Sequence, residues 1–81
     1  MALNEKIKLP EKGLDLRSPE VNLAFGIIKN LRLKKPLSGF EANILFAFLF
    51  KSMARFADLD VEKSVGASIT ILKHNNLIKQ P

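Results

Sequence analysis

The chain contains three segments in which apolar residues recur at helical spacing. The first follows Ser18-Pro19-Glu20, where serine is a preferred N-cap and proline is favoured at the first helical position. Pro36 prevents a helix from continuing into the next segment. We therefore expect a helix from Pro19 to about Leu33. Its apolar face comprises Val21, Ala24, Phe25, Ile28 and Leu31.

The second segment is apolar on nearly all sides. Ser38 and Glu41 have the spacing of a capping box, which predicts a helix from Gly39 to about Phe56. Because five of the six phenylalanines lie there, we expect it to be the central helix. Three apolar residues fall in one sector with Glu41, Lys51 and Arg55, so the first helix, the N-terminal arm or another chain must cover them. These three candidate interface residues are Ile44, Leu45 and Phe48.

The third segment predicts a helix from about Val61 to His74, behind the possible caps Asp58 and Asp60. Asparagines 75 and 76 can adopt the left-handed conformation that ends a helix. The stripe expected to face inward is Val61, Val65, Ile69 and Leu72.

Residues 1–17 lack helical periodicity and are expected to form an extended arm, and 18–81 a single helical domain. Within the arm, Ile7-Leu9 could pair with Leu77-Lys79 as a short two-stranded ribbon. The expected fold class is all-α, with three helices in a helix-turn-helix-like domain.

The composition narrows the function classes. A chain of 81 residues is one domain at most. It has no cysteine and one histidine, which excludes disulfides and thiol nucleophiles and disfavours a metal site. No nucleophile and base are placed together, so we expect neither an enzyme nor a cofactor. The chain shows no secretory signal and no apolar stretch long enough to span a bilayer, and we expect a cytoplasmic protein.

The net charge of +5 favours an anionic partner. No acid occurs between Glu20 and Glu41, whereas four cations fall within seven residues of that interval. They could contact phosphates, or they could complement the dipole at the end of the first helix. These cations are Lys29, Arg32, Lys34 and Lys35.

The C-terminal half carries the pattern Leu-Ser-x-x-Glu-x-x-Ile-Leu from Leu37 and ends with Leu-Lys-His-Asn-Asn-Leu-Ile. Over residues 37–78 it resembles the helix-turn-helix core of winged-helix transcriptional regulators. The resemblance implies that Asn76 replaces a turn glycine and that the third helix enters the major groove of DNA. Only three residues follow Ile78, too few for a hairpin wing.

The face opposite the predicted inward stripe carries no acid and offers donors to base edges and phosphates. An ordinary solvated face is the alternative interpretation. The candidate contacts on this helix are Lys63, Ser64, Ala67, Thr70, Lys73 and His74.

We therefore expect a small regulator that binds double-stranded DNA as a homodimer, since one short helix reads too few base pairs. The alternative is a helical protein-interaction module that binds a protein partner through Ile44, Leu45 and Phe48. DNA binding should weaken steeply with salt, whereas apolar protein contact should not.

Overall fold

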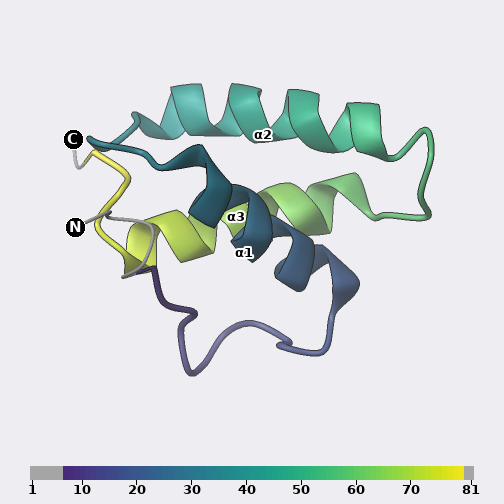
Figure 1. Ribbon diagram of the computed structural model, residues 1–81, viewed down its shortest axis with the longest axis horizontal. Coiled ribbons are helices and arrows are strands. Elements are labelled where there is room, and N and C mark those ends of the chain that lie inside the picture. Colours follow the sequence, from purple (N-terminus) through teal and green to yellow (C-terminus); the bar gives the residue numbers. More distant parts are fainter. Residues whose placement is uncertain (1–6, 80–81) are drawn as a thin grey trace.

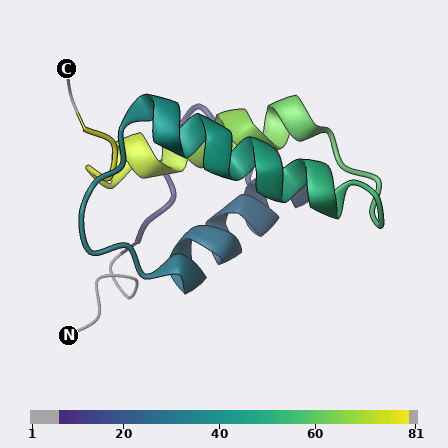
Figure 2. The same ribbon diagram turned by 90° about the horizontal axis from the view of Figure 1, so that it is seen from above.

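The computed structural model describes residues 7–79 and contains three helices in this part of the chain. They are α1 (Pro19–Leu31), α2 (Gly39–Met53) and α3 (Val61–His74). The all-α class is therefore confirmed. Figure 1 shows α2 above α3, with α1 crossing in front of α3, and Figures 1 and 2 together show α2 and α3 running side by side in opposite directions.

The central helix is α3. Both α1 and α2 pack against it, whereas no Cα atom of α1 lies within 8 Å of a Cα atom of α2. The prediction that the phenylalanine-rich helix is central is therefore wrong. The apolar content of α2 exceeds what its single inward face can bury, and part of it points away from the bundle.

The predicted caps at the three helix starts are confirmed. The Ser18 hydroxyl accepts the N–H of Val21 at 3.4 Å, and the Asp60 carboxylate accepts the N–H of Lys63 at 3.1 Å. Ser38 and Glu41 form a complete capping box, with reciprocal hydrogen bonds of 3.0 Å. Each cap satisfies backbone donors that the first helical turn leaves free.

The C-terminal ends of α1 and α2 differ from the predicted ends. Arg32 adopts a left-handed conformation at φ 50°, which ends α1 two residues before the predicted Leu33. The second helix ends at Met53, not Phe56, and residues 54–56 form a turn. The bounds of α3 match the prediction, and Asn76 has the expected positive φ, 59°.

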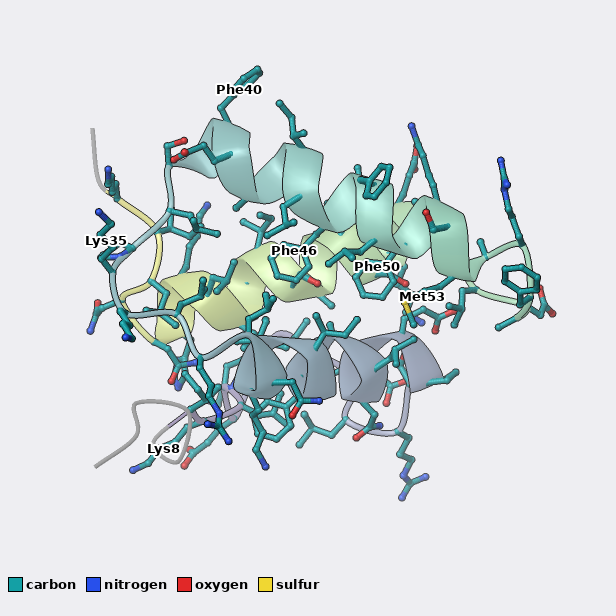
Figure 3. The ribbon with its side chains drawn as sticks, turned by 45° about the horizontal axis from the view of Figure 1, so that its top comes forward. Lys8, Lys35, Phe40, Phe46, Phe50 and Met53 are labelled. Carbon is teal, nitrogen blue, oxygen red and sulfur yellow. The ribbon has the colours of Figure 1, made fainter. Side chains whose placement is uncertain are left out.

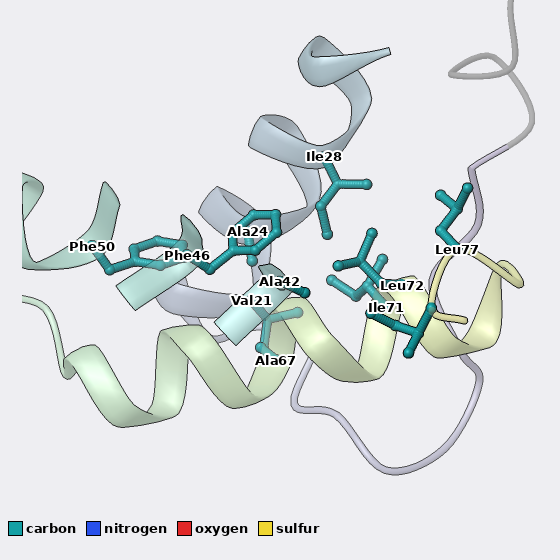
Figure 4. Packing of buried hydrophobic residues seen from close by; sticks show 11 residues of the cluster. Val21, Ala24, Ile28, Ala42, Phe46, Phe50, Ala67, Ile71, Leu72 and Leu77 are labelled. Carbon is teal, nitrogen blue, oxygen red and sulfur yellow. The ribbon is translucent and has the colours of Figure 1, made fainter. Parts of the chain in front are cut away.

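The core lies where the three helices meet. Phe46 and Phe50 of α2 are fully buried, with their ring centroids 6.4 Å apart. Figure 4 shows their rings with the aliphatic side chains of α1 and α3. The buried apolar set is Val21, Ala24, Ile28, Ala42, Phe46, Phe50, Ala67, Ile71, Leu72, Leu77 and Ile78.

The orientation of α3 differs from the prediction. Of the expected inward stripe only Leu72 is buried, and Val61, Val65 and Ile69 are half-buried. Small side chains take their place because α3 packs against a helix on two sides, and small residues let backbones approach closely. The buried face of α3 consists of Ser64, Ala67, Ser68, Ile71 and Leu72.

The segments that flank the helices meet at one end of the bundle. Leu37 and Ile78 form an isolated parallel bridge, in which Leu37 N–H donates to Leu77 O at 2.9 Å and Lys79 N–H to Leu37 O at 2.7 Å. The Asn75 amide exchanges two hydrogen bonds with the backbone of Lys8, at 2.9 and 2.8 Å. The predicted ribbon of Ile7-Leu9 with Leu77-Lys79 is therefore wrong, since 77–79 pairs with Leu37. Residues 1–6 of the predicted arm lie outside the described residues.

At the opposite end, Glu20 joins the starts of α1 and α3. Its carboxylate accepts the N–H of Asp60 at 3.1 Å and the hydroxyl of Ser18 at 2.9 Å. These two hydrogen bonds, chiefly that from Asp60, hold the pKa of Glu20 below its ordinary value. Hydrogen bonds from Ser38 lower the pKa of Glu41 in the same way.

These lowered pKa values predict acid sensitivity. The folded protein binds fewer protons than the unfolded chain near the ordinary glutamate pKa of about 4.3, so stability present at neutral pH is lost as the pH falls through that range and below. The Glu20→Gln variant should lose less stability than the wild type between pH 7 and pH 3. Urea unfolding at several pH values measures this. An identical loss in both proteins would contradict the assignment to Glu20.

Candidate interaction surfaces

The outer face of α2 carries large apolar side chains in contact with solvent. Phe40, Ile44 and Phe48 are spaced four residues apart and are 76 %, 54 % and 69 % exposed. We call these three residues the outer strip. Figure 3 shows Phe40 pointing away from the bundle while Phe46 and Phe50 point into it. Neither α1 nor the described part of the N-terminal arm covers the strip.

The structure divides the predicted interface set. Ile44 and Phe48 lie on the outer strip, whereas Leu45 is half-buried and packs against the core. Sequence reasoning missed Phe40. Its position four residues before Ile44 was the available signal, because residues four apart lie on one helical face.

A groove between α2 and α3 borders the strip. It has a volume of about 570 Å³. Its lining includes the apolar residues Val61, Val65 and Ile69 of α3, together with Glu62, Lys51 and Asn43. A smaller hollow of about 440 Å³ lies beside Phe40 and Ile44. Asn43 and Ala47 line both, so the two depressions adjoin along α2. The apolar surface therefore extends from the outer strip onto α3.

The charges beside the strip are ordered along α2. Glu41 lies in its first turn, Lys51 in its last, and Arg55 in the turn that follows. All three side chains are exposed. Hydrogen bonds from Ser38, and the nearby ammonium groups of Lys79 and Lys35, lower the pKa of Glu41. The Glu41 charge is therefore offset by two neighbouring lysines, and the Lys51 and Arg55 end of the strip is positive.

The candidate DNA contacts on α3 do not share one exposed face. Ser64 and Ala67 are buried, so the prediction that Ala67 points outward is wrong. Thr70 is half-buried, and its hydroxyl donates to Gly66 O at 2.9 Å within the helix. The physical reason is the rotation of α3 about its axis, which buries its small residues against α1 and α2. The remaining exposed candidates are Lys63, Lys73 and His74.

Most of the predicted cations gather at one end of the molecule. Arg32, Lys34 and Lys35 follow α1, and the Leu37 bridge to Ile78 brings Lys79 to the same place. The bonds from Asn75 hold Lys8 beside the last turn of α3, and Figure 3 shows Lys8 and Lys35 at the same end. We call this exposed group the basic end. It comprises Lys8, Arg32, Lys34, Lys35, Lys73, His74 and Lys79.

Two predicted cations differ from this group. Lys63 lies near the start of α3, ten residues and about 15 Å along the helix from Lys73. The ammonium of Lys29 lies 5.1 Å from the ring centre of Phe25 on α1 and interacts with that ring. Lys8 and Lys79 were missed from the sequence, because contacts between distant segments bring them to the basic end.

Between residues 7 and 79, no three histidine, aspartate or glutamate side chains come together as metal ligands. No helix in the same range is long and apolar enough to cross a membrane.

Comparison with known proteins adds no assignment. No protein-family model, curated protein sequence or solved structure matches the chain. The function is therefore argued from the two surfaces described above.

Proposed function

We propose that this chain is a helical protein-interaction module that binds its partner through the outer strip of α2 and the adjoining groove. The observation that carries the proposal is the exposure of Phe40, Ile44 and Phe48 on a helix whose opposite face is fully buried. Scattered exposed apolar residues are common, but a contiguous strip beside an apolar groove is typical of an interaction site.

The free energy gained by burying the outer strip, compared with the cost of association, indicates how much further surface a partner must contact. Burying three such side chains contributes at most roughly 4 to 9 kcal/mol, at about 1.5 to 3 kcal/mol each. Association costs about 4 to 15 kcal/mol in lost freedom of motion. The strip alone therefore supports weak binding, and a stable complex must also fill the groove formed with Val61, Val65 and Ile69. An amphipathic helix laid along the groove fits this requirement.

A photo-crosslinking amino acid at position 48 tests the proposal. In cells that express the full chain, benzoylphenylalanine in place of Phe48 should give a covalent protein adduct on irradiation. The same group in place of Leu16, which is exposed before α1 and outside the strip, is the matched control and should give none. Equal labelling from both positions, or no adduct from position 48, would contradict the proposal.

A second candidate function is binding to the phosphate backbone of double-stranded DNA through the basic end. The observation that favours it is the gathering of cations from four segments of the chain. Within Lys29–Glu41 and Leu72–Lys79, Glu41 is the one acidic residue. Such a surface attracts phosphates without reading sequence. Sequence readout by α3, and with it a helix-turn-helix regulator, remains a hypothesis. A helix-turn-helix pair crosses at about 90 to 120°, unlike the antiparallel course of α2 and α3.

Salt dependence tests this second function. If the six lysine and arginine side chains of the basic end contact phosphates, the affinity of the protein for random duplex DNA should fall by roughly three orders of magnitude between about 50 and 200 mM salt. Lys35→Ala should lower the slope of log affinity against log salt by about one unit. Lys51→Ala, at the other end of the molecule, should leave the slope unchanged. Absence of binding at low salt would exclude the DNA function.

A further inference from the structure

One side-chain amide fastens the N-terminal arm to the end of α3. The Oδ1 of Asn75 accepts the N–H of Lys8 at 2.9 Å, and the Nδ2 donates to the carbonyl of Lys8 at 2.8 Å. The same Nδ2 also donates to the carbonyl of Ile71 at 2.8 Å, which holds the amide against the last turn of α3. Asn75 therefore offers Lys8 both the acceptor and the donor that a neighbouring strand would offer.

These bonds determine where the charge of Lys8 lies. Both use the backbone of Lys8, and its side chain is exposed. The residues on either side of it, Ile7 and Leu9, are half-buried and pack against the core, because successive side chains of an extended segment point to opposite sides. The ammonium group of Lys8 therefore projects away from the core, beside the last turn of α3.

The last turn of α3 already carries two exposed basic residues, Lys73 and His74. Attachment of the arm brings the positive charge of Lys8 beside them, and like charges in proximity repel one another. A phosphate that contacts these side chains relieves the repulsion. Whatever favours the attached arm must then favour phosphate binding by the same factor, since the coupling between two binding equilibria is reciprocal.

We propose that Asn75 is a positioning residue for phosphate binding at the basic end, and that duplex DNA and the attached arm stabilise each other through Lys8. The inference rests on the second candidate function, binding of the DNA backbone, and makes the arm part of the binding surface. Asn75 itself contributes no charge to that surface. It acts by holding Lys8 in place, so that the contact with phosphate does not require the arm to be ordered first.

Amide hydrogen exchange of the wild type tests the coupling without any substitution. The N–H of Lys8 exchanges when its bond to Asn75 opens. Random duplex in excess should slow this exchange. For one phosphate contact the slowing should shrink about threefold between about 50 and 200 mM salt, since affinity varies with roughly the 0.9 power of salt. An exchange rate that duplex leaves unchanged would overturn the proposal.

Lys8→Ala distinguishes this coupling from simple shielding by bound DNA. Alanine keeps the two backbone bonds to Asn75 but has no charge to contact a phosphate. Duplex should still bind this variant through the other cations, yet it should no longer slow exchange at position 8. Slowing equal to that of the wild type would show that the Lys8 side chain does not couple the arm to DNA.

Asn75→Ala releases the arm without changing the net charge. Lys8→Ala should lower the slope of log affinity against log salt by about one unit, and Asn75→Ala should lower it toward the same value. The double variant should lose no more than Lys8→Ala alone, because both changes remove one contact. Asn30→Ala, at an exposed position in the last turn of α1, is the matched control and should leave the slope unchanged.

Circular dichroism melts show whether each variant is folded at the temperature of the titration. If Asn75→Ala unfolds there, hydrogen exchange of the wild type still decides. The inference and the function fail separately. Duplex binding that responds to Lys35→Ala, but not to Asn75→Ala in the folded state, would refute the role of the arm and leave DNA backbone binding standing. Absence of duplex binding at low salt would refute both.

Discussion

Replacing Phe46 or Phe50 with alanine should cost about 3 to 5 kcal/mol of stability, as for other buried phenylalanines. Both rings are fully buried where the three helices meet, and alanine would leave a cavity that the surrounding helices fill only in part. At about 0.05 to 0.15 kcal/mol per residue, a chain of this length has roughly 4 to 12 kcal/mol in total. The loss is therefore at least about a quarter of the total, and near the lower end of this range either variant should be largely unfolded.

Urea unfolding of dilute protein measures this loss, and α2 supplies its own control. Phe40→Ala makes the same substitution on the same helix at a residue that is 76 % exposed. It should shift the unfolding free energy by about 0.5 kcal/mol or less. Equal losses at Phe40 and Phe46 would mean that α2 does not turn the described face toward the core.

Ala67→Leu is the second substitution with a large expected effect. Ala67 is 3 % exposed and belongs to the apolar core, so a larger side chain must displace its neighbours. Overpacking of this kind costs about 1 to 3 kcal/mol, occasionally more. The sequence pattern instead places Ala67 on an outward face, where leucine would be tolerated, so the variant decides between the two orientations of α3.

Thermal melting followed by circular dichroism is sufficient for this comparison. For a domain of this size, a loss of 1 kcal/mol lowers the Tm by about 4 to 8 °C. Lys73→Leu introduces the same side chain on the same helix at an exposed position and should change the Tm by far less. A Tm for Ala67→Leu that equals that of the control would favour the outward orientation.

Local chemistry made the helix starts predictable. Ser18, Ser38 and Asp60 each bond a backbone N–H three residues ahead, and such bonds depend only on neighbours in the chain. The turn after α3 follows the same logic, because asparagine tolerates the positive φ found at Asn76. The end of α1 was less predictable, since arginine has no comparable preference for the left-handed conformation of Arg32.

The arrangement of the helices was not predictable from periodicity. The apolar pattern of α2 indicates a helix that needs cover, but not whether that cover comes from the same chain. On α3, the strongest apolar stripe misidentified the buried face because Ser64 and Ser68 are buried. Their hydroxyls donate to the carbonyls of Asp60 and Ser64, at 2.8 and 2.9 Å, which satisfies them without an outside partner. A hydrophobicity scale counts such residues as surface residues.

The residues of the two candidate surfaces were also only partly predictable from the sequence. Ile44 and Phe48 were predictable because their exposure follows from their position on one helix. The basic end was predictable only for residues close in sequence, such as Lys34 and Lys35. Lys8 and Lys79 join them through the Asn75 bonds and the Leu37 bridge, which connect segments far apart in the chain.

The central position of α3 also affects how the protein folds during synthesis. It is the last of the three helices to leave the ribosome, yet α1 and α2 depend on it for their packing. Isolated helices of 13 and 15 residues are only marginally stable in water. The nascent chain therefore carries two unsupported amphipathic segments until Leu72 emerges. Folding should then occur in one late cooperative step, and the phenylalanines of α2 are exposed to chaperones until it is complete.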